Sequence, residues 1–286
     1  MANTRELRRR IKSVKNTSQI TKAMQMVAAT KMRRAQTQAL GGRPYHGALS
    51  KALVKLLAQS KEEKHPLLSI KQNNKVGVLL LSTDKSLCGA LNTNLIKTAQ
   101  NFSQGKEVVF YTSGKKGRNF VVKTSKELVA DFENSDTLNF QKAIQVSKLL
   151  SQAFLKNEVG EIFIIYPHFV STLRQESLVT KLLPIDTLIE SEEIESNHIL
   201  HSEFLMEPNA KQLLEYTLYH FLEIKVYQTM LETKASEHSA RMIAMQNATN
   251  NAKELVSDLT LAYNQTRQEG ITNELLEITS ALAALE

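Results

Sequence analysis

Two segments in the middle of the sequence combine residue types that could hold a phosphate. Ser113-Gly114-Lys115-Lys116-Gly117 sets glycines beside lysines, but it lacks the G-x-x-x-x-G-K-[ST] spacing that lets backbone amides wrap a phosphate. Thr83-Asp84-Lys85 follows an apolar run, as a ligand-binding βα loop would, but no G-x-G-x-x-G fingerprint accompanies it. We therefore interpret the first segment as a basic turn and the second as a capped turn.

A metal site is the second kind of chemistry that the sequence could offer, between residues 192 and 201. His198 and His201 lie three residues apart, close to Glu192, Glu193 and Glu195. Neither an H-E-x-x-H motif nor a Cys/His set accompanies them, so a solvated segment is the simpler interpretation.

Cys88 is the only cysteine of the chain, which excludes an internal disulfide and favours a reducing compartment. No obvious His or Asn companion lies in its motif, so we predict a packed thiol rather than a nucleophile. With these candidates set aside, we predict no catalytic residue, no cofactor-binding residue and no metal ligand in this chain.

The elements that would position such residues begin with a long N-terminal helix. A heptad-like stripe runs through residues 7–39, and the apolar set widens over residues 20–32. A helix that is apolar around most of its circumference is typically surrounded by other protein. We predict a helix over 3–40, a break in the helix at Gly41-Gly42 and Pro44, and a further helical stretch over 45–59.

The C-terminal helical pattern is longer, and it follows Glu207-Pro208. One apolar stripe continues almost to the end of the chain, interrupted by the polar residues Gln228, His238 and Thr249. As one helix, residues 210–285 would reach roughly 110 Å, whereas residues 3–40 would reach about 57 Å. We therefore predict antiparallel pairing of the two helices, with the unmatched part of the longer helix covered by a protein partner.

The middle of the chain, about 70–200, has a different pattern. Short apolar runs typical of buried strands alternate with helical stretches, which favours βαβ units and a mostly parallel sheet. The predicted strands are Val76–Leu81, Glu107–Tyr111, Glu161–Tyr166 and an edge strand over Gln175–Leu183, and the predicted helices are Leu91–Phe102 and Leu138–Leu155. The predicted fold class is thus α/β plus coiled coil: residues 1–60 and 208–286 form a long antiparallel coiled coil, and residues 70–200 form a central Rossmann-like domain.

Charge is distributed unevenly over the chain, whose formal net charge is +7. Residues 1–43 contain eleven Lys or Arg and one acid, whereas residues 253–286 contain six acids against two bases. The basic residues between Arg5 and Lys15 could contact phosphate backbones or an acidic protein surface, and charge alone leaves this choice open. No run approaches 18 apolar residues, so we predict no membrane span. Because a helical pattern already begins at Leu7, we treat the N-terminus as mature protein rather than a transit peptide.

The residues of both terminal helices carry a specific resemblance. Residues 11–36, IKSVKNTSQITKAMQMVAATKMRRAQ, resemble the N-terminal signature of the gamma subunits of F-type ATP synthases. Residues 236–252, SEHSARMIAMQNATNNA, resemble that family's C-terminal signature, which Arg267-Gln268 and Ile271-Thr272 continue. Further matches are Arg43-Pro44-Tyr45, Leu87-Cys88-Gly89 and Glu207-Pro208.

This resemblance implies a non-catalytic rotor shaft that couples ion flow to ATP synthesis and helps to regulate ATPase activity. Its implied partners are three alpha and three beta subunits in a ring, the epsilon subunit and the c-ring of the membrane sector, with no nucleic acid. The implied contacts to the ring are Met24, Arg241, Arg267, Gln268 and Thr272, and Glu207 is implied to face the c-ring. The implied location is peripheral, at the cytoplasmic face of a bacterial cell membrane.

Overall fold

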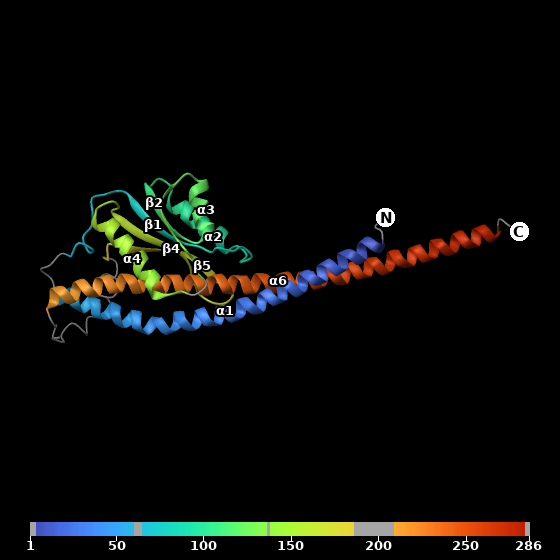
Figure 1. Ribbon diagram of the computed structural model, residues 1–286, viewed down its shortest axis with the longest axis horizontal. Coiled ribbons are helices and arrows are strands. Elements are labelled where there is room, and N and C mark those ends of the chain that lie inside the picture. Colours follow the sequence, from blue (N-terminus) through green and yellow to red (C-terminus); the bar gives the residue numbers. More distant parts are fainter. Residues whose placement is uncertain (1–3, 60–64, 136–137, 186–208, 284–286) are drawn as a thin grey trace. The chain divides into compact units, whose positions relative to one another are not determined.

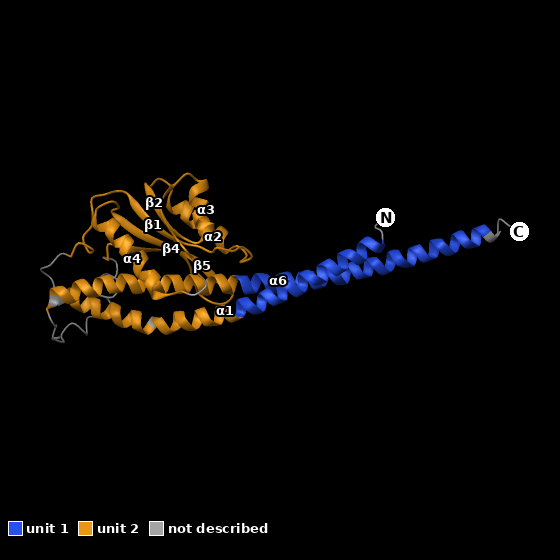
Figure 2. Ribbon diagram, in the orientation of Figure 1, with its two compact units in different colours: residues 1–29, 241–286 blue, residues 30–240 orange. Residues whose placement is uncertain are grey.

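The computed structural model describes residues 4–59, 65–135, 138–185 and 209–283. In chain order the elements are α1 (Thr4–Gln59), β1 (Val76–Leu81), α2 (Leu91–Phe102), β2 (Val108–Ser113), α3 (Lys115–Lys123), β3 (Glu127–Phe132), α4 (Phe140–Leu155), β4 (Glu161–Phe169), β5 (Gln175–Leu183) and α6 (Ala210–Ala283) (Figure 1). The chain divides into two compact units (Figure 2): unit 1 comprises residues 1–29 and 241–286, and unit 2 comprises residues 30–240.

The sheet of unit 2 is mixed, with the strand order β3-β2-β1-β4-β5. β1 pairs in parallel with both β2 and β4, and β2 pairs in parallel with β3. Only the edge strand β5 is antiparallel, because it returns from β4 through a short connection. The order reverses at β1, as in doubly wound sheets, so the predicted Rossmann-like domain is confirmed.

Two apolar layers cover the two faces of this sheet. Alternate residues of β1 point to opposite faces: Leu79 and Leu81 pack in one cluster, and Val78 and Leu80 pack in the other. α2 and α3 cover the second face through side chains such as Leu95 and Phe120. A strand buried on both faces explains why β1 is a continuous apolar run.

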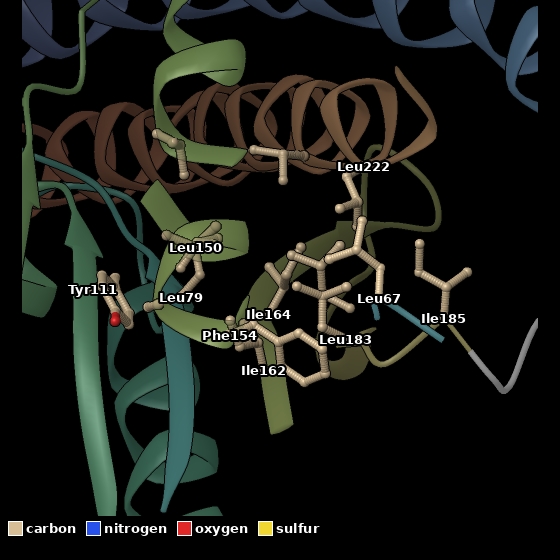
Figure 3. Packing of buried hydrophobic residues seen from close by; sticks show 14 of the residues in the cluster. Leu67, Leu79, Tyr111, Leu150, Phe154, Ile162, Ile164, Leu183, Ile185 and Leu222 are labelled. Carbon is tan, nitrogen blue, oxygen red and sulfur yellow. The ribbon is translucent and has the colours of Figure 1, made fainter. Parts of the chain in front are cut away.

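The first face is covered by α4 and by the long helices. Leu150 and Phe154 of α4 meet Ile162 and Ile164 of β4, and Leu222 of α6 joins the same cluster (Figure 3). Burying each such side chain stabilises the fold by about 1.5–3 kcal/mol. Unit 2 is therefore one packed body in which α6 is part of the core of the α/β domain.

α1 and α6 are antiparallel partners within each unit. In unit 2, Gln228 Nε2 donates to the Ala39 carbonyl at 3.0 Å, and the Tyr45 hydroxyl lies 2.8 Å from His220 Nε2. Residue numbers thus increase along α1 where they decrease along α6, so the two helices run antiparallel. In unit 1, the Thr249 hydroxyl donates to Thr21 Oγ1 at 2.8 Å, and the two helices again lie side by side (Figure 2).

The predicted break in the first helix is wrong, because α1 continues through Gly41, Gly42 and Pro44 to Gln59. A proline inside a helix removes one backbone hydrogen bond, and glycines weaken helices by about 1 kcal/mol each. Here the packing of α1 against α6 overrides these local costs. Gly42 has a positive role, since a Cβ at this position would lie 2.8 Å from Gln228 Oε1.

The sequence patterns missed two elements of the domain. β3 alternates exposed and half-buried residues at the sheet edge, so it lacks the apolar run that marked the other strands. α3 starts at Lys115, where we predicted only a basic turn, and its buried residues Gly117, Phe120 and Val121 form one face against the sheet.

Candidate functional site

The loops that follow β1 and β2 occupy the position where doubly wound sheets bind ligands. Here the donors at the start of α3 are used by side chains of the chain itself. Ser82 Oγ accepts from Gly117 N at 2.8 Å and donates to the Gly114 carbonyl at 3.0 Å, and Asp84 Oδ1 accepts from Lys115 N at 2.9 Å. A Cβ at Gly114 would lie 2.4 Å from the Ser82 carbonyl oxygen. The backbone amides that could cradle a phosphate thus bind protein oxygens instead.

The loop around Cys88 is held in a similar way. The hydroxyl and the backbone amide of Thr83 both contact the side chain of Asn92. Asn92 Nδ2 in turn donates to Cys88 Sγ at 3.1 Å. The Cys88 side chain is buried, so the prediction of a packed thiol is confirmed.

Neither a metal cluster nor a membrane span is found among the residues that the structure describes. No three His, Cys, Asp or Glu side chains in this part of the chain gather as metal ligands would. No helix in the same ranges has both the length and the apolar character to cross a bilayer. The pair His198 and His201 lies outside the described residues, as does Glu207.

The paired helices of unit 1 bury a narrow seam. The seam contains Leu7 and Ala28 of α1 and Met245, Thr249 and Ala252 of α6. Other apolar side chains of the same α1 segment point away from it: Ile20, Met26 and Val27 are each more than half exposed. The wide apolar set predicted for residues 20–32 is therefore only partly covered by α6.

None of the residues that the structure describes covers the last turns of α6. Every residue from Arg267 to Ala281 is exposed. This segment presents a row of apolar side chains, Ile271, Leu275, Leu276 and Ile278, each at least half exposed. Figure 2 shows α6 continuing past the start of α1 within unit 1. A row of neighbouring exposed apolar side chains is typical of protein interaction sites.

The predicted contact residues fall at two levels of unit 1. Arg267, Gln268 and Thr272 lie together on α6, where the Thr272 hydroxyl donates to the Gln268 carbonyl at 3.0 Å. Arg241 is 26 residues earlier in the same helix, which corresponds to about 39 Å. It is 9% exposed, and Met24, one turn after Thr21 on α1, is half-buried. The structure thus groups the first three residues and separates them from Arg241 and Met24.

Sequence reasoning missed a second set of polar residues, which lies inside unit 2. From Gln228 to Ser239, α6 buries many polar or charged side chains; we call this stretch the polar segment of α6. Its buried polar members are Gln228, Thr229, Glu232, Thr233, Lys234, Ser236, Glu237, His238 and Ser239. The signal was available, since Gln228 and His238 interrupt the apolar stripe, and a polar residue at a core position often fixes helix register.

These features define a class of protein: an α/β domain combined with a pair of long helices, one of which has exposed apolar side chains near its end. The sequence model of the ATP synthase family matches residues 3–285. ATP synthase gamma chains of Methylacidiphilum infernorum and Akkermansia muciniphila are 45% and 43% identical, with all of both chains covered in each case.

Solved structures share this fold. The rotor of the Euglena gracilis mitochondrial ATP synthase contains a chain with a TM-score of 0.69 and 20% identity, covering 94% of this chain and 98% of that one. The central stalk and c-ring structure from Tetrahymena thermophila contains one with a TM-score of 0.64 and 23% identity, covering 80% and 99%. The chain belongs to the family of ATP synthase gamma chains, the non-catalytic subunits that form the central stalk, or rotor, of F-type ATP synthases.

Proposed function

We propose that this chain turns inside a ring of three alpha and three beta subunits and couples ion flow through the membrane sector to ATP synthesis on that ring. The observation that carries the proposal is the exposed end of α6. Its apolar row from Ile271 to Ile278 needs a partner, and a sleeve of other subunits would supply one.

The surface chemistry of unit 1 suits a shaft that slides against its sleeve. Ile20, Met26 and Val27 are exposed apolar side chains, whose contacts are not directional and can be exchanged without breaking hydrogen bonds. A pair of unlike helices is also asymmetric, so it would favour a different conformation in each beta subunit. Turning the pair would then shift these conformations in sequence, which links rotation to the binding of ADP and the release of ATP.

Specific polar contacts would transmit force at defined angles. We assign Arg267, Gln268 and Thr272 to one contact with the ring, because the structure exposes them on one stretch of α6. Met24 and Arg241 are assigned to a second contact in unit 1. Arg241 precedes Arg267 by about 39 Å along α6. Glu207, which lies outside the described residues, is assigned to the c-ring side.

The same proposal covers the remaining partners. The α/β domain would sit with the epsilon subunit on the c-ring, where it would also help to regulate ATPase activity. The assembled complex would be peripheral at the cytoplasmic face of a bacterial cell membrane. The basic residues between Arg5 and Lys15 are all exposed, and they would then meet protein rather than nucleic acid.

The direct test is to produce the chain together with bacterial alpha and beta subunits and to follow a bead attached to it. We expect a complex with one copy of this chain for three of each partner, and rotation of the bead during ATP hydrolysis. The control is the same preparation without the chain. Failure to co-purify with the ring, together with DNA binding whose affinity falls steeply with salt, would favour a nucleic-acid-binding protein instead.

A further inference from the structure

One face of α6 is tied by hydrogen bonds to two other elements of unit 2. Gln228 Nε2 donates to the Ala39 carbonyl of α1 at 3.0 Å. Ser239 Oγ donates to the Thr172 carbonyl, in the connection between β4 and β5, at 2.7 Å. Between them, Glu232 Oε2 lies 2.6 Å from Nδ1 of His168 on β4.

The spacing of these residues puts them on a single stripe. Residues 228, 232, 235 and 239 follow the 4-3-4 pattern that keeps side chains on one side of a helix. Residue 235 is Ala235, which packs with Ala35 of α1 and Phe169 of β4 in a small apolar cluster. The stripe therefore alternates hydrogen bonds with a close apolar contact over about 16 Å of helix.

These contacts differ from the usual hydrogen bonds of buried hydroxyls in helices. Thr229 and Thr233 lie in the same stretch and are as deeply buried, but their hydroxyls donate to carbonyls of α6 itself, those of Val226 and Thr229. Gln228 and Ser239 instead reach backbone carbonyls of other elements. Such bonds are directional, so they resist both rotation of α6 about its axis and sliding along it, which apolar packing alone resists less.

A glycine in α1 makes room for the hydrogen bond between Gln228 and Ala39. A Cβ at Gly42 would lie 2.8 Å from Gln228 Oε1, so the glycine leaves room for the amide to reach Ala39. Gln228 Nε2 also lies 3.4 Å from Glu232 Oε1. This contact connects the hydrogen bond of Gln228 to α1 with the contact of Glu232 to β4. Ser239 is fully buried, so water does not compete for its bond.

We infer that Gln228, Glu232 and Ser239 are positioning residues that lock α6 against the α/β domain, so that torque passes from the domain into the helix. This inference rests on the proposed rotor function, since torque has meaning only in a rotating complex. α6 is one helix from Ala210 to Ala283, so a lock in unit 2 is carried along the covalent helix toward its far end. The polar segment thus determines how stiffly α6 is fixed to the α/β domain in unit 2.

The test compares Ser239→Ala and Gln228→Leu, alone and together, with the matched control Thr233→Val in the assembled rotor. Each change removes a buried polar group at nearly constant shape, but only the first two break bonds between elements. With the α/β domain fixed to a surface, the angular fluctuations of a bead on the far end report torsional stiffness. Hydrogen exchange of residues 170–174 in the same complex reports opening of the β4–β5 connection.

We expect wider angular fluctuations in the double variant than in Thr233→Val, with ATP hydrolysis retained. Exchange of the β4–β5 connection should be roughly fivefold faster in Ser239→Ala, as loss of one hydrogen bond implies. Equal fluctuations in the double variant and the control would overturn the inference while leaving the rotor function standing. If the unsubstituted chain forms no rotating complex, the proposed function fails, and the inference fails with it.

Discussion

Gln228 and the exposed polar residues near the end of α6 have different roles. Gln228 is 9% exposed and bonded to the backbone of α1, so it shapes the chain itself. Gln268 and Arg267 are exposed on the surface of α6. Exposed residues such as these can contact a partner, and their substitution should change function without changing stability.

Arg267→Ala and Gln268→Ala should therefore weaken coupling without unfolding the chain. We expect changes of unfolding free energy within about 0.5 kcal/mol, as for exposed positions generally, but less ATP-driven ion pumping per ATP hydrolysed. Gln265→Ala is the control, because Gln265 is an exposed glutamine one turn away on α6. Pumping that is equal in Gln268→Ala and Gln265→Ala would contradict the contact assigned to Gln268.

We expect His46 to make the stability of unit 2 sensitive to pH. Burial and the nearby charge of Lys225 lower the pKa of His46 below 6.5, partly opposed by Glu232. Its Nε2 is buried and has no hydrogen-bond partner among the described residues. The unfolded chain then binds the proton more readily than the folded one, so stability falls as the pH drops below about 6.5, by at most about 1.4 kcal/mol per pH unit for one proton.

Urea titrations followed by tyrosine fluorescence at pH 7.5 and pH 5.5 test this expectation. The loss of stability between the two pH values should be smaller in His46→Gln than in the unsubstituted chain. His65→Gln should also reduce it, since burial lowers the pKa of His65 too, against a weaker opposing effect of Glu215. An unchanged loss in both variants would show that neither histidine is responsible.

At the scale of elements, two neighbouring glycines in α1 have different roles. Nothing lies within 4 Å of a Cβ built at Gly41, whereas a Cβ at Gly42 would meet Gln228. Gly41→Ala should therefore stabilise the chain by about 1 kcal/mol, the usual gain for alanine inside a helix. Gly42→Ala should show no gain, because moving the Gln228 amide offsets it. Thermal unfolding of both variants measures the difference, and an equal gain in the two would mean that Gln228 adjusts freely.

The elements also show what the sequence could and could not predict. The bounds of β1, β5 and α2 agree with the prediction, because each is an apolar or amphipathic run with clear ends. β3 was missed because an edge strand such as Glu127–Phe132 needs only one buried face and carries acids on the other. The continuity of α1 through Pro44 depends on contacts with α6, more than 170 residues away, which no local pattern contains.

The same distinction holds for the site. Arg267, Gln268 and Thr272 were proposed as contacts from a family signature, and α6 exposes them on one stretch. The polar segment of α6 was visible only as interruptions in a stripe. Its partners, the carbonyls of Ala39 and Thr172, are backbone groups, and a sequence does not reveal which backbone groups are near.

At the scale of the whole molecule, the two units differ in how much they bury. Unit 2 has two large apolar clusters, whereas the seam of unit 1 is narrow and rests on a few side chains such as Leu7, Ala28 and Met245. Two paired helices with so little core are only marginally stable by themselves.

Unit 1 should therefore exchange its backbone amides faster than the α/β domain in the free chain. We expect residues 4–29 and 241–283 to exchange at least about tenfold faster than β1 and β4, since local opening there costs less free energy. In the complete complex the difference should shrink as partners cover both helices. Equal protection of the two units in the free chain would contradict this view of unit 1.

The exposed apolar row at the end of α6 also has a consequence for how much of this chain a cell can produce. Ile271, Leu275, Leu276 and Ile278 can be covered by another copy of the same chain as readily as by a foreign subunit. Any surplus of this polypeptide over the proposed ring subunits would then tend to aggregate. In the proposed complex, a cell would have to match the rate of synthesis of this chain to that of its partners, because the same apolar surface that contacts the ring would promote aggregation of the unassembled chain.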